Sequence, residues 1–165
     1  LDNNGNAVSI TTTNGEGCGS IIPEYGIMMN NMLGEHDLNP YGFHKWNKKR
    51  RLPTMMSPTI ITQKSKAKYI LGSGGSNRIR SANIQVILNL LLKNMNLSEA
   101  INAPRIHLEG NNLFHEPGLL IPNEKLKNII INSFSHKNLF FGGVNAVSDH
   151  LAIGDTRRGG HGIIC

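Results

Sequence analysis

The chain has 165 residues, a formal net charge of +6 and a hydrophobic fraction of 39%. This length corresponds to about one domain, and the composition excludes an intrinsically disordered chain, because enough apolar surface is present to build a core. Aromatic residues make up only 5%, so we expect a core of Ile, Leu, Val and Met side chains. The positive charge permits a nucleic acid or an acidic membrane as partner but requires neither.

The cysteines and apolar runs exclude several other classes. Cys18 and Cys165 are far apart in the sequence, and two free thiols are favoured over a disulfide, which stays open. No Cys-x-x-Cys or His-x-x-x-His spacing occurs, so we expect no metal and no other cofactor. The longest apolar run, residues 84–92, is interrupted by Gln85 and Asn89 and is too short to cross a membrane.

The first part of the chain is predicted to consist of short strands and loops. Residues 3–6 form a turn, and the alternating β-branched residues of 7–13 predict a strand. A turn followed directly by a strand suggests that an upstream strand pairs back through it. A glycine-rich loop spans residues 14–20, and residues 26–32 form a short apolar strand or buried segment. Residues 34–58 are expected to form a long ordered loop of the kind that often carries function.

The middle of the chain contains the clearest pattern. Residues 59–62 and 68–71 predict a hairpin, and a helix follows over about residues 78–95. This helix is apolar around most of its circumference, which predicts a buried central helix. Ser76 or Asn77 is a suitable N-cap residue for it.

The remaining elements alternate between helix and strand. They are a short helix over residues 98–103 ended by Pro104, a hairpin of residues 105–109 and 112–116, a helix over residues 123–134 capped by Asn123, strands at residues 139–141, 145–148 and 151–153, and a polar tail at residues 155–160. This order favours helices layered on antiparallel sheets, an α+β fold, over alternating βαβ units.

The segment of residues 72–80, between a strand and the long helix, is the most informative one. Its glycines let the backbone approach a ligand closely, and the helix start offers unpaired N–H groups and the positive end of a dipole. The corner is therefore suited to hold negative charge, either a bound phosphate or an oxyanion formed during a reaction. A nucleotide-binding site is the weaker alternative, because the Gly-Lys-Ser/Thr ending of a P-loop and the acidic residue of a dinucleotide fold are missing. A tight helix entry without a ligand also stays open.

Six segments resemble, in order and approximate spacing, the small subunit of the gamma-glutamyltranspeptidase (glutathione hydrolase) family. They are residues 5–9, 26–31, 56–59, 71–79, 102–107 and 154–159. The resemblance extends over almost the whole chain. It implies the αββα sandwich of an N-terminal-nucleophile hydrolase, of which residues 1–165 supply the small-subunit half.

The resemblance also implies where the nucleophile lies. Family precursors cleave themselves into a large and a small subunit, and the new N-terminal Thr attacks the substrate while its own α-amine acts as base. That Thr is expected a few residues before Leu1, so the chain resembles a catalytic subunit that lacks its nucleophile. We expect no activity from the chain alone, and exposure of an apolar face that its partner covers. The implied partners are the large subunit of the same precursor and a γ-glutamyl substrate such as glutathione, with no nucleic acid and no membrane span.

The resemblance assigns catalytic roles to three residues. Gly75 and Ser76, with Gly74 beside them, match the positions whose backbone N–H groups form an oxyanion hole. Because the donors belong to the backbone, Ser in place of a second Gly is chemically acceptable. Thr13 matches a threonine that orients the nucleophile, although the residue pattern alone favours an ordinary strand threonine there.

Besides Gly74, which is also assigned to substrate binding, four further residues match positions that bind the substrate. Asn14 is the nearest match to a substrate-contacting Asn, but the loop after it differs from the family pattern. Glu35 stands where an acidic residue, usually Asp, binds the α-ammonium group. Thr54 and Met55 stand where two serines hold the α-carboxylate, and Met55 has no hydrogen-bond donor. These departures keep open a related acylase with another acyl group, or a nonenzymatic relative.

The other charged segments receive simpler interpretations. The basic run of residues 45–51 is interpreted as a solvated loop rather than an RNA contact. A structural salt-bridge cluster is expected from Asp155, Arg157 and Arg158. His107 is expected to be structural, whereas two further histidines are expected at the surface, namely His44 and His161.

Overall fold

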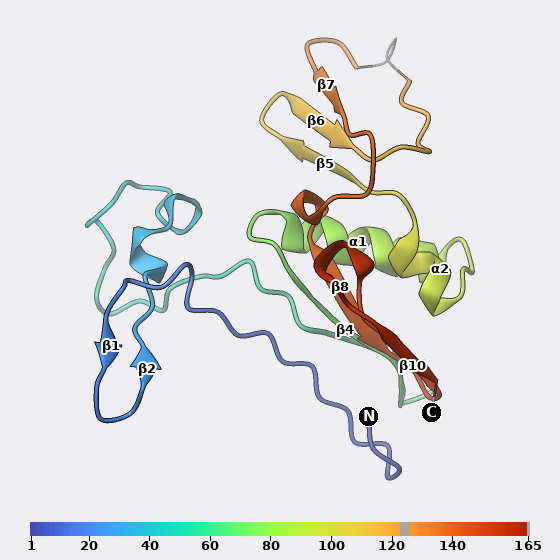
Figure 1. The fold of residues 1–165 in the computed structure, drawn as a ribbon, viewed down its shortest axis with the longest axis horizontal. Coiled ribbons are helices and arrows are strands. Elements are labelled where there is room, and N and C mark those ends of the chain that lie inside the picture. The colour runs from blue at the N-terminus through green and yellow to red at the C-terminus, as the bar shows by residue number, and fades with distance from the viewer. Residues whose placement is uncertain (123–125, 165) are drawn as a thin grey trace. The chain divides into compact units, whose positions relative to one another are not determined.

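The computed structural model describes residues 1–122 and 126–164. The chain forms two compact units, which are described separately. The larger unit comprises Leu1–Thr11 and Met56–Cys165, and the smaller unit comprises Thr12–Met55. Figure 1 gives the labels of the helices and strands.

The centre of the larger unit is a five-stranded sheet with the order β10-β9-β8-β4-β3, in which every neighbouring pair is antiparallel. The strands are β3 (Thr59–Gln63), β4 (Lys66–Gly74), β8 (Gly143–Val147), β9 (Leu151–Ile153) and β10 (Gly162–Ile164). The hairpin predicted for residues 59–62 and 68–71 corresponds to β3 and β4, and the strands predicted for residues 145–148 and 151–153 correspond to β8 and β9. These elements and the α+β class are confirmed. Because β4 pairs antiparallel with both neighbours, the helix after it is not the crossover of a βαβ unit, which removes the basis for a dinucleotide fold.

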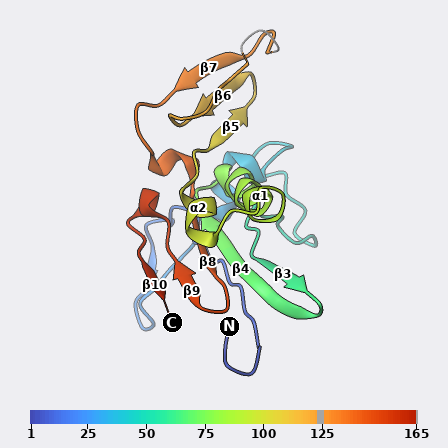
Figure 2. The ribbon, with the colours of Figure 1, turned by 90° about the vertical axis from the view of Figure 1, so that its right-hand side faces the viewer.

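Two helices, α1 (Arg78–Leu91) and α2 (Leu97–Asn102), pack against this sheet (Figures 1 and 2). The core between them is aliphatic, as the composition predicts, and its buried members are Leu71, Ala82, Val86, Leu90, Leu97, Ala100, Ile101, Val144 and Ala146. A capping box starts α2, because the Asn96 side chain accepts from the Glu99 N–H at 2.9 Å and the Glu99 carboxylate accepts from the Asn96 N–H at 3.1 Å. The predicted short helix is thus confirmed.

Helix α1 is amphipathic rather than buried all round, which corrects the prediction of a central helix. Val86 is 0% exposed, whereas Ile84 is 50% and Leu91 47% exposed. The helix also ends at Leu91, earlier than predicted. The reason is Asn94, whose φ of +53° lies in the left-handed region that commonly ends helices.

A second, three-stranded sheet contains β5 (Ile106–Glu109), β6 (Asn112–His115) and β7 (Ile130–Ser133). The predicted hairpin of β5 and β6 is confirmed, and β7 joins β6 in parallel. The helix predicted for residues 123–134 is wrong over its described part, and its expected cap Asn123 lies outside the described residues. Asn128 has a φ of +65°, which interrupts a helix, and the β-branched pair of β7 is paired with β6 instead.

The strand predicted for residues 7–13 is also wrong. This segment is irregular, and in the larger unit the Ser9 hydroxyl donates to the Leu71 carbonyl at 2.8 Å. Side-chain hydrogen bonds of Ser and Thr to the backbone compete with a regular ladder.

Two other segments differ from the sequence prediction because a side chain caps a short helix. Leu139–Phe141 is a 3-10 helix, η4, in which the Asn138 side chain accepts from the Phe140 N–H. Thr156–Arg158, in the predicted polar tail, is the 3-10 helix η5, and Asp155 caps it.

The smaller unit has little regular structure. It contains a hairpin of β1 (Ile21–Ile22) and β2 (Ile27–Met28), followed by the 3-10 helices η1 (Met32–Gly34) and η2 (His36–Leu38). The short strand expected within residues 26–32 is present, but Ile27 is 54% exposed and the segment is not buried. Within the loop predicted for residues 34–58, η2 is a short 3-10 helix, whereas residues 39–58 contain no helix or strand.

No helix in the described part of the chain is long and apolar enough to cross a membrane.

Candidate active site

The corner between β4 and α1 has the backbone geometry of a close-approach site. Gly75 has a φ of +131° and Ser76 a φ of +51°, so two consecutive residues lie in the left-handed half of conformational space. The Gly75 carbonyl accepts from the Arg78 N–H at 3.0 Å, and the Ser76 carbonyl accepts from the Ile79 N–H at 3.0 Å. The first N–H groups of a helix have no partner within the helix. In α1, the first two of them bond to the corner carbonyls that precede the helix.

The corner is packed against a second pair of glycines that the sequence analysis did not single out. A side-chain carbon at Gly75 would lie 2.8 Å from the Gly142 Cα, and one at Gly142 would lie 3.0 Å from the Gly74 carbonyl oxygen. Gly74 also pairs with Gly143 across β4 and β8. The two backbones therefore touch where four glycines meet. The recurrence of Gly-Gly at 74–75 and 142–143 is the sequence signal that would have revealed this contact.

Arg78 and Arg158 attach further elements to the corner. The Arg78 Nε donates to the Phe140 carbonyl at 3.0 Å, and its guanidinium lies 4.5 Å from the centre of the Phe140 ring. Arg158 lies along Gly143, and its Nη2 would be 3.3 Å from a side-chain carbon at Gly75. The corner is thus enclosed by η4 and by the residue that ends η5.

In the smaller unit, three of the predicted site residues surround Gly15. The Thr13 hydroxyl accepts from the Gly15 N–H at 2.9 Å, and the Asn14 carbonyl accepts from the Asn31 N–H at 3.1 Å. A side-chain carbon at Gly15 would overlap both the Asn31 Oδ1 and the Glu35 Oε1. Asn31, which was not predicted as a site residue, therefore lies beside Gly15 together with Glu35. It also accepts from the Glu16 N–H at 2.8 Å.

The other predicted binding residues lie at the end of the smaller unit. Thr54 is exposed and Met55 half-buried in the irregular segment that precedes β3. Gly74, Gly75 and Ser76 belong to the larger unit. Whether these groups form one site stays a prediction.

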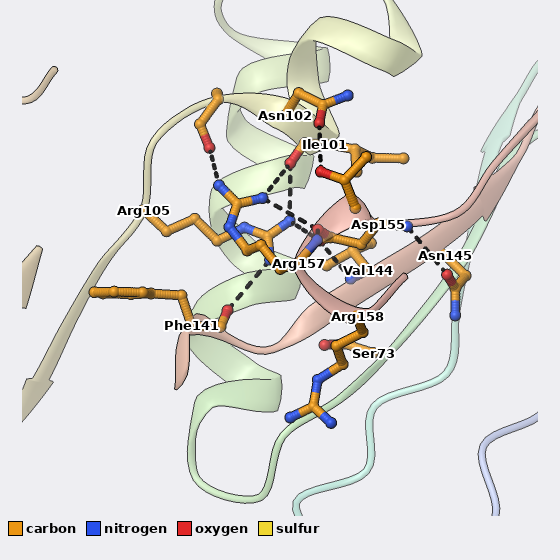
Figure 3. Close-up of polar contacts among 12 residues, drawn as sticks. Ser73, Ile101, Asn102, Arg105, Phe141, Val144, Asn145, Asp155, Arg157 and Arg158 are labelled. Atoms are coloured by element: carbon orange, nitrogen blue, oxygen red, sulfur yellow. Dashed lines mark hydrogen bonds and ion pairs between the residues drawn. The ribbon is translucent and has the colours of Figure 1, made fainter. Parts of the chain in front are cut away.

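Beside the corner, the larger unit contains a buried network of two arginines and two carboxylates, of which Figure 3 labels Arg105, Arg157 and Asp155. The Arg105 Nη2 lies 2.6 Å from the Asp155 Oδ2, and the Arg157 Nη2 lies 2.6 Å from the Glu116 Oε2. Arg157 also contacts Asp155, with Nη1 and Oδ1 3.2 Å apart. The four side chains are at most 2% exposed.

The predicted salt-bridge cluster is confirmed for Asp155 and Arg157 but is wrong for Arg158. Figure 3 shows Arg158 directed away from Asp155, and the described residues offer it no carboxylate partner. Arg105 and Glu116 were not predicted as members of the cluster, because the hairpin that they flank meets η5 only in the folded chain.

Burial and charge move the pKa values in the network in different directions. Burial works to raise the pKa of Asp155, but the charge of Arg105 and the hydrogen bonds from the Val144 and Arg157 amides outweigh it, and that pKa lies below its ordinary value of 3.8. Burial and the charge of Arg157 together lower the pKa of Arg105. Burial also opposes the charged form of Arg157, yet Glu116 and Asp155 raise its pKa above the ordinary value.

The histidines are placed as expected. His107 is 7% exposed, and burial, with the nearby charges of Arg78 and Arg80, lowers its pKa despite Glu109. His44 and His161 are exposed. Within residues 1–122 and 126–164, no group of three or more His, Cys, Asp and Glu side chains is arranged to hold a metal ion.

The antiparallel sheet layered with helices is shared with solved gamma-glutamyltranspeptidases, which places the fold in the class of the N-terminal-nucleophile hydrolases. A variant of the Helicobacter pylori gamma-glutamyltranspeptidase is similar to this chain with a TM-score of 0.72 and 28% identity, covering 99% of this chain and 93% of that one. An acivicin-inhibited gamma-glutamyltranspeptidase has a TM-score of 0.71 and 28% identity, covering 98% and 92%.

The sequence comparisons give the family. The glutathione hydrolase proenzyme of Bacillus subtilis (strain 168) is 31% identical over 172 residues, which cover 96% of this chain and 29% of that protein. The Acylase ACY 1 proenzyme of Pseudomonas sp. (strain V22) is 31% identical over 150 residues, covering 87% and 26%. The family model described as gamma-glutamyltranspeptidase matches residues 1–164, and the chain belongs to this family. It spans less than a third of the length of these two curated relatives.

Proposed function

We propose that the protein containing this chain cleaves γ-glutamyl amides and passes the acyl group to water or to an amine, as glutathione hydrolases do. The observation that carries the proposal is the corner at Gly75 and Ser76. Its positive φ angles and its glycine packing suit backbone N–H groups that stabilise an oxyanion at a helix start. The proposed partner is the large subunit of a common precursor, which is consistent with the proenzyme names of the relatives.

The proposed reaction has two steps. The hydroxyl of a Thr preceding Leu1 attacks the γ-carbonyl carbon, and the Thr α-amine takes the hydroxyl proton. The carbonyl electrons move to oxygen, where the Gly75 and Ser76 N–H groups stabilise the charge. The C–N bond then breaks, the proton passes to the leaving amine, and water or an acceptor amine cleaves the resulting ester.

The residues of the smaller unit supply recognition in this proposal. Glu35 pairs with the α-ammonium of the glutamyl group, and the Thr54 hydroxyl binds its α-carboxylate. Asn14 contacts the substrate, and Thr13 orients the nucleophile. The Thr13 turn and Glu35 adjoin the same glycine, which supports their common role.

A related acylase with another acyl group is the second candidate. Met55 favours it, because a thioether replaces a hydroxyl at the position proposed to bind the α-carboxylate. The similarity to the Acylase ACY 1 proenzyme also supports it. With one hydroxyl, from Thr54, in place of two, the site is expected to prefer substrates that carry an α-carboxylate less strongly over those that lack it.

The test is the hydrolysis of a γ-glutamyl anilide by the full gene product, compared with a glutaryl anilide that lacks the α-ammonium. We expect turnover of the γ-glutamyl compound and its loss when the upstream Thr is replaced by Ala. Gly75→Ala keeps the backbone N–H, but its side-chain carbon would lie 2.8 Å from the Gly142 Cα at a φ of +131°, so the donor must move. This displacement is expected to lower kcat roughly 100-fold, as much as losing one oxyanion donor, while exposed Lys66→Ala leaves kcat unchanged. Preference for the glutaryl compound would favour the acylase, and no turnover of either compound would favour a nonenzymatic role.

A further inference from the structure

One face of α1 carries polar side chains at four-residue intervals, and each contacts β5. The Asn77 Nδ2 donates to the Glu109 Oε1 at 3.0 Å, and the Ser81 Oγ lies 2.9 Å from the His107 Nδ1. Gln85 donates to the Ile106 carbonyl at 2.9 Å and accepts from the Ile106 N–H at 2.9 Å. Side chains four residues apart lie on one side of a helix, so α1 and β5 are joined along a line.

The first of these contacts lies at the candidate oxyanion corner. Asn77 directly follows Ser76 and occupies the N-cap position of α1, but its side chain makes no cap hydrogen bond to the helix. It reaches Glu109 on β5 instead. Asn is a favoured N-cap residue, yet here its side chain does not accept from a helix N–H. The side chain instead connects the corner to β5 of the second sheet.

The corner has a conformation that requires such support. Ser76 holds a φ of +51° without being glycine, and residues in this region persist when the surrounding structure fixes them. The buried His107 lies next to the same carboxylate. The His107 Nε2, which has no hydrogen-bond partner, is 3.8 Å from the Glu109 Oε2.

We propose that Glu109 is a positioning residue, which holds Asn77 and thereby keeps the adjacent Gly75 and Ser76 N–H groups oriented for oxyanion binding. The inference rests on the proposed function for its effect on the reaction. Glu109 acts through Asn77, and no contact with the substrate is assigned to it. An oxyanion donor must point at the position of the developing charge, so a loosened corner costs turnover rather than substrate affinity.

The experiment compares Glu109→Ala, Glu109→Gln and Gln85→Ala in the full gene product, with a γ-glutamyl anilide as substrate. Glu109→Ala is expected to lower kcat about tenfold, equivalent to about 1.4 kcal/mol, with KM unchanged and little change in Tm. Glu109→Gln keeps an amide oxygen that accepts from Asn77, so it is expected to restore kcat. Gln85→Ala removes the contact at the far end of the line and is expected to lower Tm but not kcat.

Asn77→Ala adds a double-mutant cycle. If the two residues act as one contact, Asn77→Ala alone lowers kcat as much as Glu109→Ala does, and the double variant loses no more than either. Unchanged kcat in Glu109→Ala, failure of Glu109→Gln to restore it, or additive losses would overturn the inference.

Amide hydrogen exchange separates this inference from the proposed function. Exchange in residues 74–79 is expected to become faster in Glu109→Ala and to stay at the wild-type rate in Glu109→Gln. This measurement does not need activity. If the wild-type protein turns over no γ-glutamyl compound, the proposed function fails, while the exchange rates still support or refute the contact.

Discussion

The Arg157 guanidinium donates to both carboxylate oxygens of Glu116, with Nε–Oε1 2.7 Å and Nη2–Oε2 2.6 Å. The fork geometry of this pair is the strongest form of an arginine–carboxylate contact. Glu116 follows β6 and Arg157 lies in η5, so the pair joins the second sheet to the end of the first. Glu116 also accepts from the Arg105 N–H at 2.9 Å. This bond connects Glu116 to the residue that precedes β5.

Removing Glu116 is expected to destabilise the protein strongly. Glu116→Ala leaves Arg157 buried without its main partner, and breaking a buried pair in this way costs about 3–5 kcal/mol of the free energy of unfolding. Urea denaturation of the purified protein measures it. Asp149→Ala, an exposed carboxylate in the same unit, is the control and is expected to change the value by less than about 0.5 kcal/mol. A loss below about 1 kcal/mol for Glu116→Ala would mean that the network contributes little net stability.

The stability is expected to fall in acid because of Asp155. Its folded-state pKa lies below its ordinary value of 3.8, so the unfolded chain binds the proton more readily than the folded one. The stabilisation is present above the unfolded value and is lost as the pH falls through the folded value. Thermal unfolding between pH 6 and pH 2 measures this dependence. Asp155→Asn is expected to be less stable at pH 6 and to show a shallower decrease, and an equally steep decrease in the variant would exclude Asp155 as the cause.

Two isoleucines give a matched test of the core. Ile101 is 0% exposed between α2 and the sheet, whereas Ile84 is 50% exposed on the outer face of α1. Ile101→Ala is expected to cost about 2–5 kcal/mol, since it loses buried apolar contacts and leaves a cavity. Ile84→Ala is expected to cost about 1 kcal/mol or less in the free protein. Equal costs for the two variants, measured by urea denaturation, would contradict this assignment of the core.

An exposed Ile84 is consistent with a partner that covers the outer face of α1, which the sequence analysis expected of an isolated small-subunit segment. Ile84, Leu88, Leu91 and Leu92 are all at least 41% exposed. The apolar residues around the whole helix predicted that the helix would be buried on all sides. The chain alone buries only one face, and these four residues remain exposed on the other.

Elements whose patterns are local were predicted well. The β3–β4 hairpin, the β5–β6 hairpin, α2 and most of α1 follow from periodicity, turn residues and breakers within a few positions. Segments whose structure depends on distant partners were not. Ser9 bonds to Leu71 in place of a strand ladder, and Ile130 and Ile131 pair with β6 rather than forming a helix.

The residues of the candidate site were likewise predicted only in part. The corner at Gly74–Gly75 was recognised from its glycines before a long helix, whereas the threonine, asparagine and acidic residue of the smaller unit were assigned from the family resemblance, and their roles stay predictions. The sequence did not reveal Gly142, Asn31 or Glu109, each of which matters through a neighbour more than ten positions away.

By itself, the sequence determined the α+β class, the glycine corner before a long helix and the family pattern, since these depend on residue types at short spacing. Only the tertiary structure decided that Glu116 and Arg105 meet η5, that two glycine pairs touch, and that β5 holds the start of α1. These contacts join residues whose positions become close only when burial of the core brings the two sheets and the helices together, and no local pattern encodes that approach.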